Sequence, residues 1–186
     1  MPRLNMFNSI SLDGYFTDAN NDMSWAHAGA DDPELRGFTA ANAKGVSALV
    51  FGRITYEMMV SFWPTPQAAQ AMPDVAAGMN RARKYVFSRS LQKAEWANTT
   101  VLHGDPVAEI ARLKREGDLP LTVLGSGSIV KQLTAAGLID DYQLMVCPVI
   151  LGGGHTLFAG TTGRPMLKLA NSRAFKNGRV FLHYSA

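Results

Sequence analysis

Short apolar runs alternate with amphipathic segments over the first two-thirds of the chain. The apolar runs predict strands at 3–12, 46–51, 84–88, 100–102 and 121–124, and helical spacing of apolar residues follows most of them. Helices are expected from Pro33 to about residue 43 with Asp32 as N-cap, from residue 53 onward, near 75–80, over 106–116, and from 127 to 136 with Gly137 as C-cap. Between the first strand and the first helix, 17–31 is expected to be a long polar loop.

The last third of the chain is expected to contain strands only. A long strand at 140–151 is interrupted by Pro148, and two further strands at 166–175 and 179–184 are joined by Asn177-Gly178, a pair that favours a hairpin. The whole pattern predicts a single α/β domain over 1–186. We expect a three-layer α/β/α architecture with a mostly parallel, twisted sheet and antiparallel C-terminal strands.

Composition narrows the function classes. Hydrophobic residues make up 47% and charged residues 18% of the 186 positions, and no apolar run approaches the roughly 20 residues of a membrane span. The N-terminal residues lack a signal-peptide pattern, and the single cysteine, Cys147, excludes an internal disulfide and a cysteine-cluster metal site. We therefore expect a cytoplasmic protein without membrane or metal. The net charge of +3 and the scattered basic residues are too little for a nucleic-acid surface. A few arginines near one pocket would instead suit a phosphorylated small molecule.

The stretch Leu124-Gly125-Ser126-Gly127-Ser128-Ile129 is a candidate anion site. A strand that breaks at Gly-x-Gly into a helix leaves free backbone N–H groups at the positive end of a helix dipole, where phosphate commonly binds. The alternative is an ordinary tight turn between strand and helix. The third glycine of the dinucleotide fingerprint is absent, because Val130 stands in its place.

Two other strand ends carry similar chemistry, Gly52-Arg53-x-Thr55 and Ser88-Arg89-Ser90. The carboxyl ends of parallel strands share one edge of a sheet, so the three turns are expected to form one site for a phosphate-rich ligand. Two arginines in addition to a pyrophosphate cradle suit the extra phosphate of an NADP-type cofactor. Taken one at a time, both arginines could be solvated surface charges and the serines simple turn caps.

These motifs resemble the dihydrofolate reductase-like superfamily, in particular the branch that contains the C-terminal reductase domain of bacterial riboflavin biosynthesis (RibD). The resemblance rests on the motifs starting at Ser11, Val50, Val86, Leu124, Leu138 and Pro148, which run in the family's order. It implies NADPH as cofactor, with Gly52, Arg53 and Thr55 at its phosphates, Ser88 and Arg89 at its adenosine end, and the stretch from Leu124 through Gly125, Ser126, Gly127 and Ser128 to Ile129 at its pyrophosphate. It also implies a homodimer formed through 151–154 and the last strands.

The chain departs from these relatives at two places. Riboflavin reductases usually carry Glu-Gly-Gly where Gly125-Ser126-Gly127 stands, and a lysine where Tyr15 stands. Despite these departures, the resemblance implies an NADPH-dependent reductase of a pyrimidine- or pterin-like compound, similar to 5-amino-6-(5-phosphoribosylamino)uracil reductase. A non-catalytic nucleotide- or flavin-binding module and a dihydrofolate reductase are the alternatives. Hydride transfer also needs a proton source, for which Asp13 is the first candidate and Glu34 the second.

Overall fold

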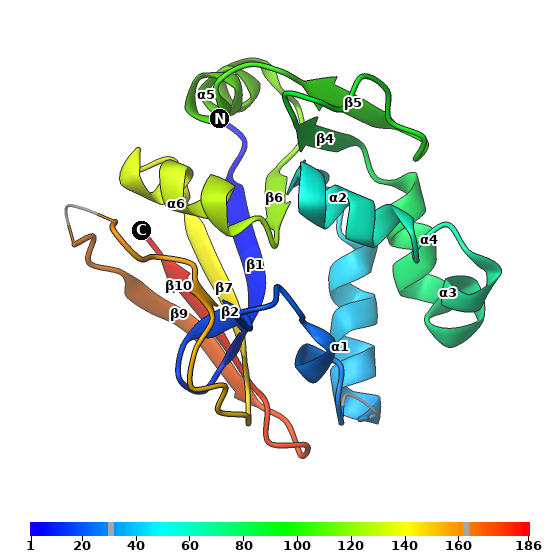
Figure 1. Cartoon of the computed structure of the whole chain (residues 1–186), viewed down its shortest axis with the longest axis vertical. Helices are drawn as coiled ribbons and strands as arrows, with labels where there is room; N and C mark the ends of the chain where they lie inside the picture. The colour runs from blue at the N-terminus through cyan, green and yellow to red at the C-terminus, as the bar shows by residue number, and fades with distance from the viewer. Residues whose placement is uncertain (30–31, 162–163) are drawn as a thin grey trace.

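The computed structural model describes residues 1–29, 32–161 and 164–186, and eight of its strands form one sheet in the order β5-β4-β3-β6-β1-β7-β10-β9 (Figure 1). All pairings from β5 to β7 are parallel, whereas β10 runs antiparallel to both of its neighbours. The strands are β1 (Leu4–Ser11), β3 (Ala48–Gly52), β4 (Lys84–Phe87), β5 (Thr99–Leu102), β6 (Leu121–Leu124), β7 (Asp141–Cys147), β9 (Lys168–Ala174) and β10 (Val180–Ser185).

Helices cover both faces of the sheet. On one face, α5 (Pro106–Glu116) and α6 (Gly127–Ala135) pack against side chains such as Val50 and Val123. On the other, α2 (Arg53–Val60) and α4 (Pro73–Arg81) pack against Phe51 and Val86, and α1 (Pro33–Lys44) packs against β7 and β10. Alternate residues of each central strand are thus buried in different layers. The expected α/β/α architecture is confirmed.

The helix ends follow the signals in the sequence. The Asp32 carboxylate accepts hydrogen bonds from the amides of Glu34 (2.8 Å) and Leu35 (3.0 Å), which caps α1 as expected. After α6, Gly137 adopts a φ of +65°, and the amide of Leu138 donates to the carbonyl of Leu133. This is the left-handed C-terminal cap that a glycine favours.

Four short elements were not expected. The first is α3 (Pro66–Ala71), which begins at Pro66 with Thr65 as a capping residue whose hydroxyl accepts from the amide of Ala68. The 17–31 loop contains a 3₁₀ helix (Ser24–Ala26), and its residues 30–31 lie outside the described part of the chain. A second, two-stranded sheet joins β2 (Tyr15–Thr17) to β8 (His155–Thr156), and the strand expected to reach residue 151 ends at Cys147.

The hairpin formed by β9 and β10 holds the loop before α1 in place through hydrogen bonds. Arg179 is 3% exposed, and its guanidinium donates to the carbonyls of Ala26 (2.9 Å), Ala28 (2.8 Å) and Gly29 (3.0 Å). The Asn177 amide also donates to the capping carboxylate of α1. These bonds satisfy a buried cation that has no carboxylate partner among the described residues. Among the described helices, none combines the length and the apolar character that crossing a membrane requires.

Candidate functional site

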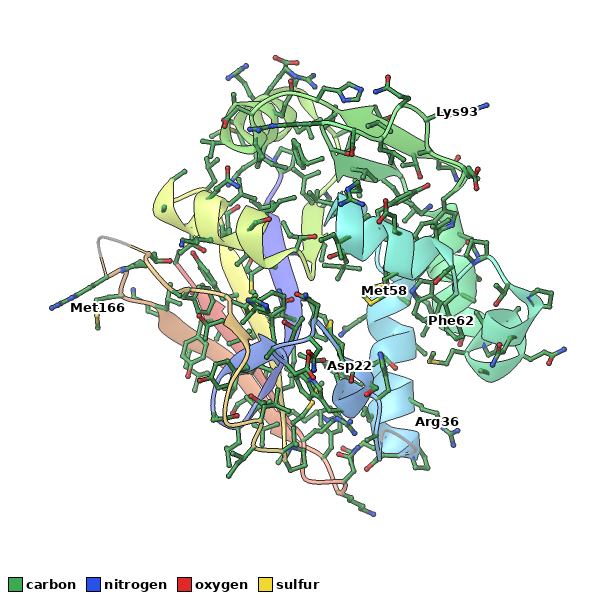
Figure 2. The ribbon with its side chains drawn as sticks, viewed as in Figure 1. Asp22, Arg36, Met58, Phe62, Lys93 and Met166 are labelled. Atoms are coloured by element: carbon green, nitrogen blue, oxygen red, sulfur yellow. The ribbon has the colours of Figure 1, made fainter. Side chains whose placement is uncertain are left out.

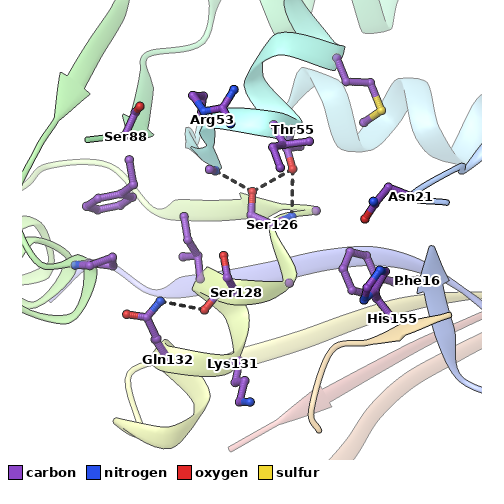
Figure 3. Close-up of a pocket in the computed structure, with 18 of the residues that line it drawn as sticks. Phe16, Asn21, Arg53, Thr55, Ser88, Ser126, Ser128, Lys131, Gln132 and His155 are labelled. Atoms are coloured by element: carbon purple, nitrogen blue, oxygen red, sulfur yellow. Dashed lines mark hydrogen bonds between the residues drawn. The ribbon is translucent and has the colours of Figure 1, made fainter. Parts of the chain in front are cut away.

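A cavity of about 840 Å³ opens along the carboxyl edge of the sheet, where β3, β4, β5 and β6 end. Figure 3 shows its lining spread from Ser88 at one end, past Arg53 and Ser126, to Asn21, Phe16 and His155 at the other. We call these the Ser88 end and the Phe16 end. The three turns expected to meet at one edge do meet there. All of the predicted cofactor-binding residues line the cavity except Leu124, which packs against the core.

Ser126 ties two of these turns together. Its hydroxyl accepts a hydrogen bond from the Gly52 amide (2.6 Å) and lies 3.0 Å from the Thr55 hydroxyl, which also accepts from the Ser126 amide (3.1 Å). Ser126 has a φ of +56°, unusual for a residue with a side chain, and is 8% exposed. These three bonds hold the strained backbone in place. The Ser126 side chain therefore builds the turn from within, and its hydroxyl is already occupied.

Each of the two glycines that flank Ser126 is required by a different close contact. At Gly125, which has a φ of +60°, an added Cβ would lie 2.9 Å from the Cγ2 of Thr55. At Gly127, it would lie 2.5 Å from the ring of Phe16. The glycines thus let α2 and β2 approach the turn closely, while the backbone stays open toward the cavity.

The first turn of α6 supplies free donors. The amides of Ile129 and Val130 donate to the Ser126 carbonyl, but those of Gly127 and Ser128 donate to no group in the described part of the chain. Both residues line the cavity, at the positive end of the helix dipole. An anion placed at this point would satisfy the two free N–H groups.

The two arginines differ in what they already bind. Arg53 forms an ion pair with Glu57 one helical turn later, with 2.8 Å between its Nη1 and the nearer carboxylate oxygen. Arg89 is exposed at the rim and forms no ion pair or hydrogen bond with any described residue. Its guanidinium is thus available to a ligand without breaking an existing contact, whereas Arg53 must share its charge with Glu57.

The Ser88 end is completed by a residue that was not expected from the sequence. The Ser88 hydroxyl accepts from the amides of Ser90 (3.2 Å) and Leu91 (2.9 Å), so it caps its own turn. Its carbonyl lies 2.8 Å from Nδ1 of His103, which follows β5 and lines the cavity. The carboxyl ends of parallel strands share one edge of the sheet, which is why the other three turns were predicted to meet there. The same reasoning predicts that a histidine directly after a fourth parallel strand lies at this edge.

The two carboxylates predicted as proton sources are not brought into the cavity. Asp13 accepts from the amides of Leu151 (3.1 Å) and Gly152 (2.7 Å), and hydrogen bonding, chiefly from Ser11, lowers the pKa of its carboxyl group. Glu34 is exposed and forms an ion pair with Arg173 of β9 at 2.6 Å. Neither lines the cavity. The structure places Asp13 as a link between two turns and Glu34 as a surface link from α1 to the sheet edge.

The fold has close counterparts among solved structures. The "Putative riboflavin biosynthesis protein" of Shewanella sp. PV-4 superposes with a TM-score of 0.78 at 22% identity and 98% coverage of both chains. A diaminohydroxyphosphoribosylaminopyrimidine deaminase/5-amino-6-(5-phosphoribosylamino)uracil reductase of Thermotoga maritima gives 0.67 at 17% identity, over 99% of this chain and 56% of that one. A pyrimidine reductase-like protein of Corynebacterium diphtheriae gives 0.63 at 13% identity, over 99% and 91%.

Sequence comparison gives the same relationship. The uncharacterized proteins YyaP and YwjB of Bacillus subtilis are each 26% identical, over 95% and 96% of this chain and 90% and 95% of their own lengths. The family model of the RibD C-terminal domain matches residues 2–181. Together with a cavity formed by the family's motifs, this match establishes that the chain belongs to the RibD C-terminal domain family of the dihydrofolate reductase-like superfamily.

Proposed function

We propose that this protein is an NADPH-dependent reductase of a pyrimidine- or pterin-like small molecule. The observation that carries the proposal is the arrangement of one long cavity. It has Arg89, which has no ion pair or hydrogen bond with a described residue, at one end, the free α6 amides in its middle, and the aromatic ring of Phe16 at the other end. Such an order of charge, backbone donors and apolar surface matches a phosphorylated dinucleotide with a flat ring at one terminus.

The residues present fit the cofactor that the family implies. The amides of Gly127 and Ser128 would bind the pyrophosphate, since they donate to no described residue and stand at the start of α6, beside the cavity. Arg89 would bind the phosphate on the adenosine ribose, because guanidinium pairs with phosphate through two parallel hydrogen bonds. The ring of Phe16 would pack against the nicotinamide at the Phe16 end. When bound, NADPH supplies the hydride for reduction of a C=N or C=O bond.

The substrate class comes from the comparisons. The Thermotoga protein is named as a reductase of 5-amino-6-(5-phosphoribosylamino)uracil and the Corynebacterium protein as pyrimidine reductase-like. A pyrimidine with an amino-linked phosphoribosyl group is therefore the first compound to offer as substrate. The apolar Phe16 end provides a surface on which a flat heterocycle can stack.

Titration with reduced nucleotides tests the cofactor assignment. We expect nicotinamide fluorescence to report tight binding of NADPH and much weaker binding of NADH, followed by NADPH oxidation when 5-amino-6-(5-phosphoribosylamino)uracil is added. NADPH binding without turnover of this compound or of dihydrofolate would instead indicate a binding module on the same fold. Turnover of dihydrofolate alone would identify a dihydrofolate reductase. Binding of neither nucleotide would exclude the proposed function.

We further propose that two copies associate through the β9 edge of the sheet. All seven residues of β9 are exposed, including Leu169 at 57%, and Met166 just before it is 91% exposed and projects outward from this side (Figure 2). An edge strand with free backbone groups and apolar side chains is a site for strand pairing or sheet packing. Light scattering should give a dimer for the wild type and a monomer for Leu169→Glu. A wild-type monomer at micromolar concentration would refute this part.

A further inference from the structure

The proposed reaction needs a proton at the end of the cavity where hydride is transferred, and neither Asp13 nor Glu34 reaches the cavity. The lining contains three side chains of the types that commonly act as general acids, namely His103, Asp105 and His155. His103 lies against the Ser88 carbonyl, and Asp105 caps α5 directly after it. Both belong to the Ser88 end. Among the described lining residues, His155 is therefore the candidate proton donor at the Phe16 end.

The position of His155 is fixed by the small second sheet. β8 pairs with β2 so that His155 stands opposite Thr17, with a register shift between Tyr15 and Thr17. Irregular pairing of this kind commonly redirects a side chain beside an active site. Figure 3 shows His155, Phe16 and Asn21 at the same end of the cavity.

Thr17 gives an independent indication that a polar ligand binds here. It lines the cavity and is only 6% exposed, yet its hydroxyl has no hydrogen-bond partner among the described residues. A buried hydroxyl without a partner costs roughly 1–3 kcal/mol, and a substrate group that reached it would offset this cost. His155 is exposed and likewise forms no hydrogen bond or ion pair with the described residues. Two polar side chains without partners among the described residues thus lie on paired strands at the Phe16 end.

We propose that His155 is the proton donor of the reduction, with the Thr17 hydroxyl orienting the substrate heteroatom. The substrate carbon of the C=N or C=O bond gains the hydride of NADPH, the π bond breaks, and its electron pair takes the proton of the imidazolium. The products are the amine or alcohol, NADP⁺ and neutral imidazole. Because His155 is exposed, solvent restores its proton after each turnover. This inference rests on the proposed function.

The test compares His155→Gln and His155→Ala with His27→Gln as the matched control, since His27 is exposed and lies outside the cavity. Single-turnover oxidation of NADPH by 5-amino-6-(5-phosphoribosylamino)uracil is followed for each protein, and NADPH affinity is measured separately by fluorescence. We expect both His155 variants to be slower by about 100-fold or more, the usual contribution of general acid catalysis, with NADPH affinity changed less than about 3-fold. Added imidazole should restore part of the rate of His155→Ala.

A second readout does not depend on turnover. The chain has four histidines, so their ring carbon signals can be assigned in NMR spectra by single substitutions. Addition of NADP⁺ together with the uracil compound should shift the His155 signal and leave that of His27 in place. If the wild type turns over the compound while the His155 variants stay within about 3-fold of it, the proton-donor assignment is wrong and the reductase proposal stands. If NADPH binds and the compound is not reduced, the substrate proposal fails, and this assignment fails with it.

Discussion

Replacement of Arg89 by alanine isolates the interaction that would distinguish NADPH from NADH. Arg89 is exposed at the rim of the cavity and forms no contact with another described side chain that the substitution would break. The folded protein should therefore keep its thermal midpoint. Only a ligand phosphate would lose a partner, which makes the change in affinity a direct measure of that contact.

The expected loss of NADPH affinity follows from the exposure of Arg89 at the rim of the cavity. A hydrogen bond to a charged group is worth about 1.5–3 kcal/mol, and solvent screening at the rim argues for the lower half of that range. A loss of about 2 kcal/mol weakens NADPH binding about 30-fold. NADH lacks the ribose phosphate, so its affinity should change less than about 2-fold. Arg53→Ala should cost less, about 5-fold, because Glu57 already holds part of that guanidinium.

Fluorescence titrations of wild type, Arg89→Ala and Arg89→Lys with both nucleotides measure these quantities. The lysine variant keeps the charge but not the paired geometry, and is expected between the other two. High salt should reduce the difference between wild type and Arg89→Ala, since screening weakens an exposed ion contact. Equal loss of NADPH and NADH affinity would refute the assignment of Arg89 to the extra phosphate, as would an unchanged NADPH affinity.

Three further predictions concern other parts of the structure. Gly127→Ala places a methyl group against the Phe16 ring. The substitution should lower the free energy of unfolding by about 1–3 kcal/mol in urea unfolding and weaken NADPH binding in titrations. Unchanged stability and affinity would show that the ring moves aside freely. Burial lowers the pKa of Lys84 from 10.5 to about 8, so between these values the unfolded state binds more protons, and wild-type stability should rise with pH by up to about 3 kcal/mol relative to Lys84→Met. Equal slopes of the free energy of unfolding against pH would contradict this. Asp13→Ala should lower the thermal midpoint, because the Gly152 amide loses its acceptor, while turnover stays within about 3-fold; a large loss of turnover would return Asp13 to the catalytic candidates.

The sheet and the meeting of three turns at one of its edges were predictable from the sequence because both depend on local signals. Apolar runs, proline and aspartate at helix starts, and glycine after a strand each report on a few neighbouring residues. The elements that were missed are short or depend on distant partners. The two-residue β8 has no periodicity to detect, and α3 has only six residues and begins at a proline, a residue that also commonly follows the end of a helix.

The prediction of the proton sources was limited for the same reason, because the role of a side chain depends on partners that are distant in the sequence. Asp13 was predicted from its place after β1, and that place is correct, but the carboxylate points to backbone amides 138 and 139 residues later in the chain. Asp-Gly looks the same in the sequence whether its carboxylate faces a ligand or a distant turn. His155 directly follows the glycine-rich motif that starts at Pro148, and nothing in that motif indicates a chemical role for the histidine. Only the pairing of β8 with β2 shows that it lines the cavity.

The hydrogen bonds of Ser126 also affect the thermodynamics of ligand binding. Because one hydroxyl bridges Gly52 and Thr55, the loop after β3 and the loop after β6 are ordered together when the chain folds. A ligand that contacts both then loses little conformational entropy of the protein on binding, which favours high affinity from few contacts. Ser126→Ala would remove this shared restraint. Calorimetry should then show NADPH binding with a more unfavourable entropy, even where every group that touches the ligand is retained.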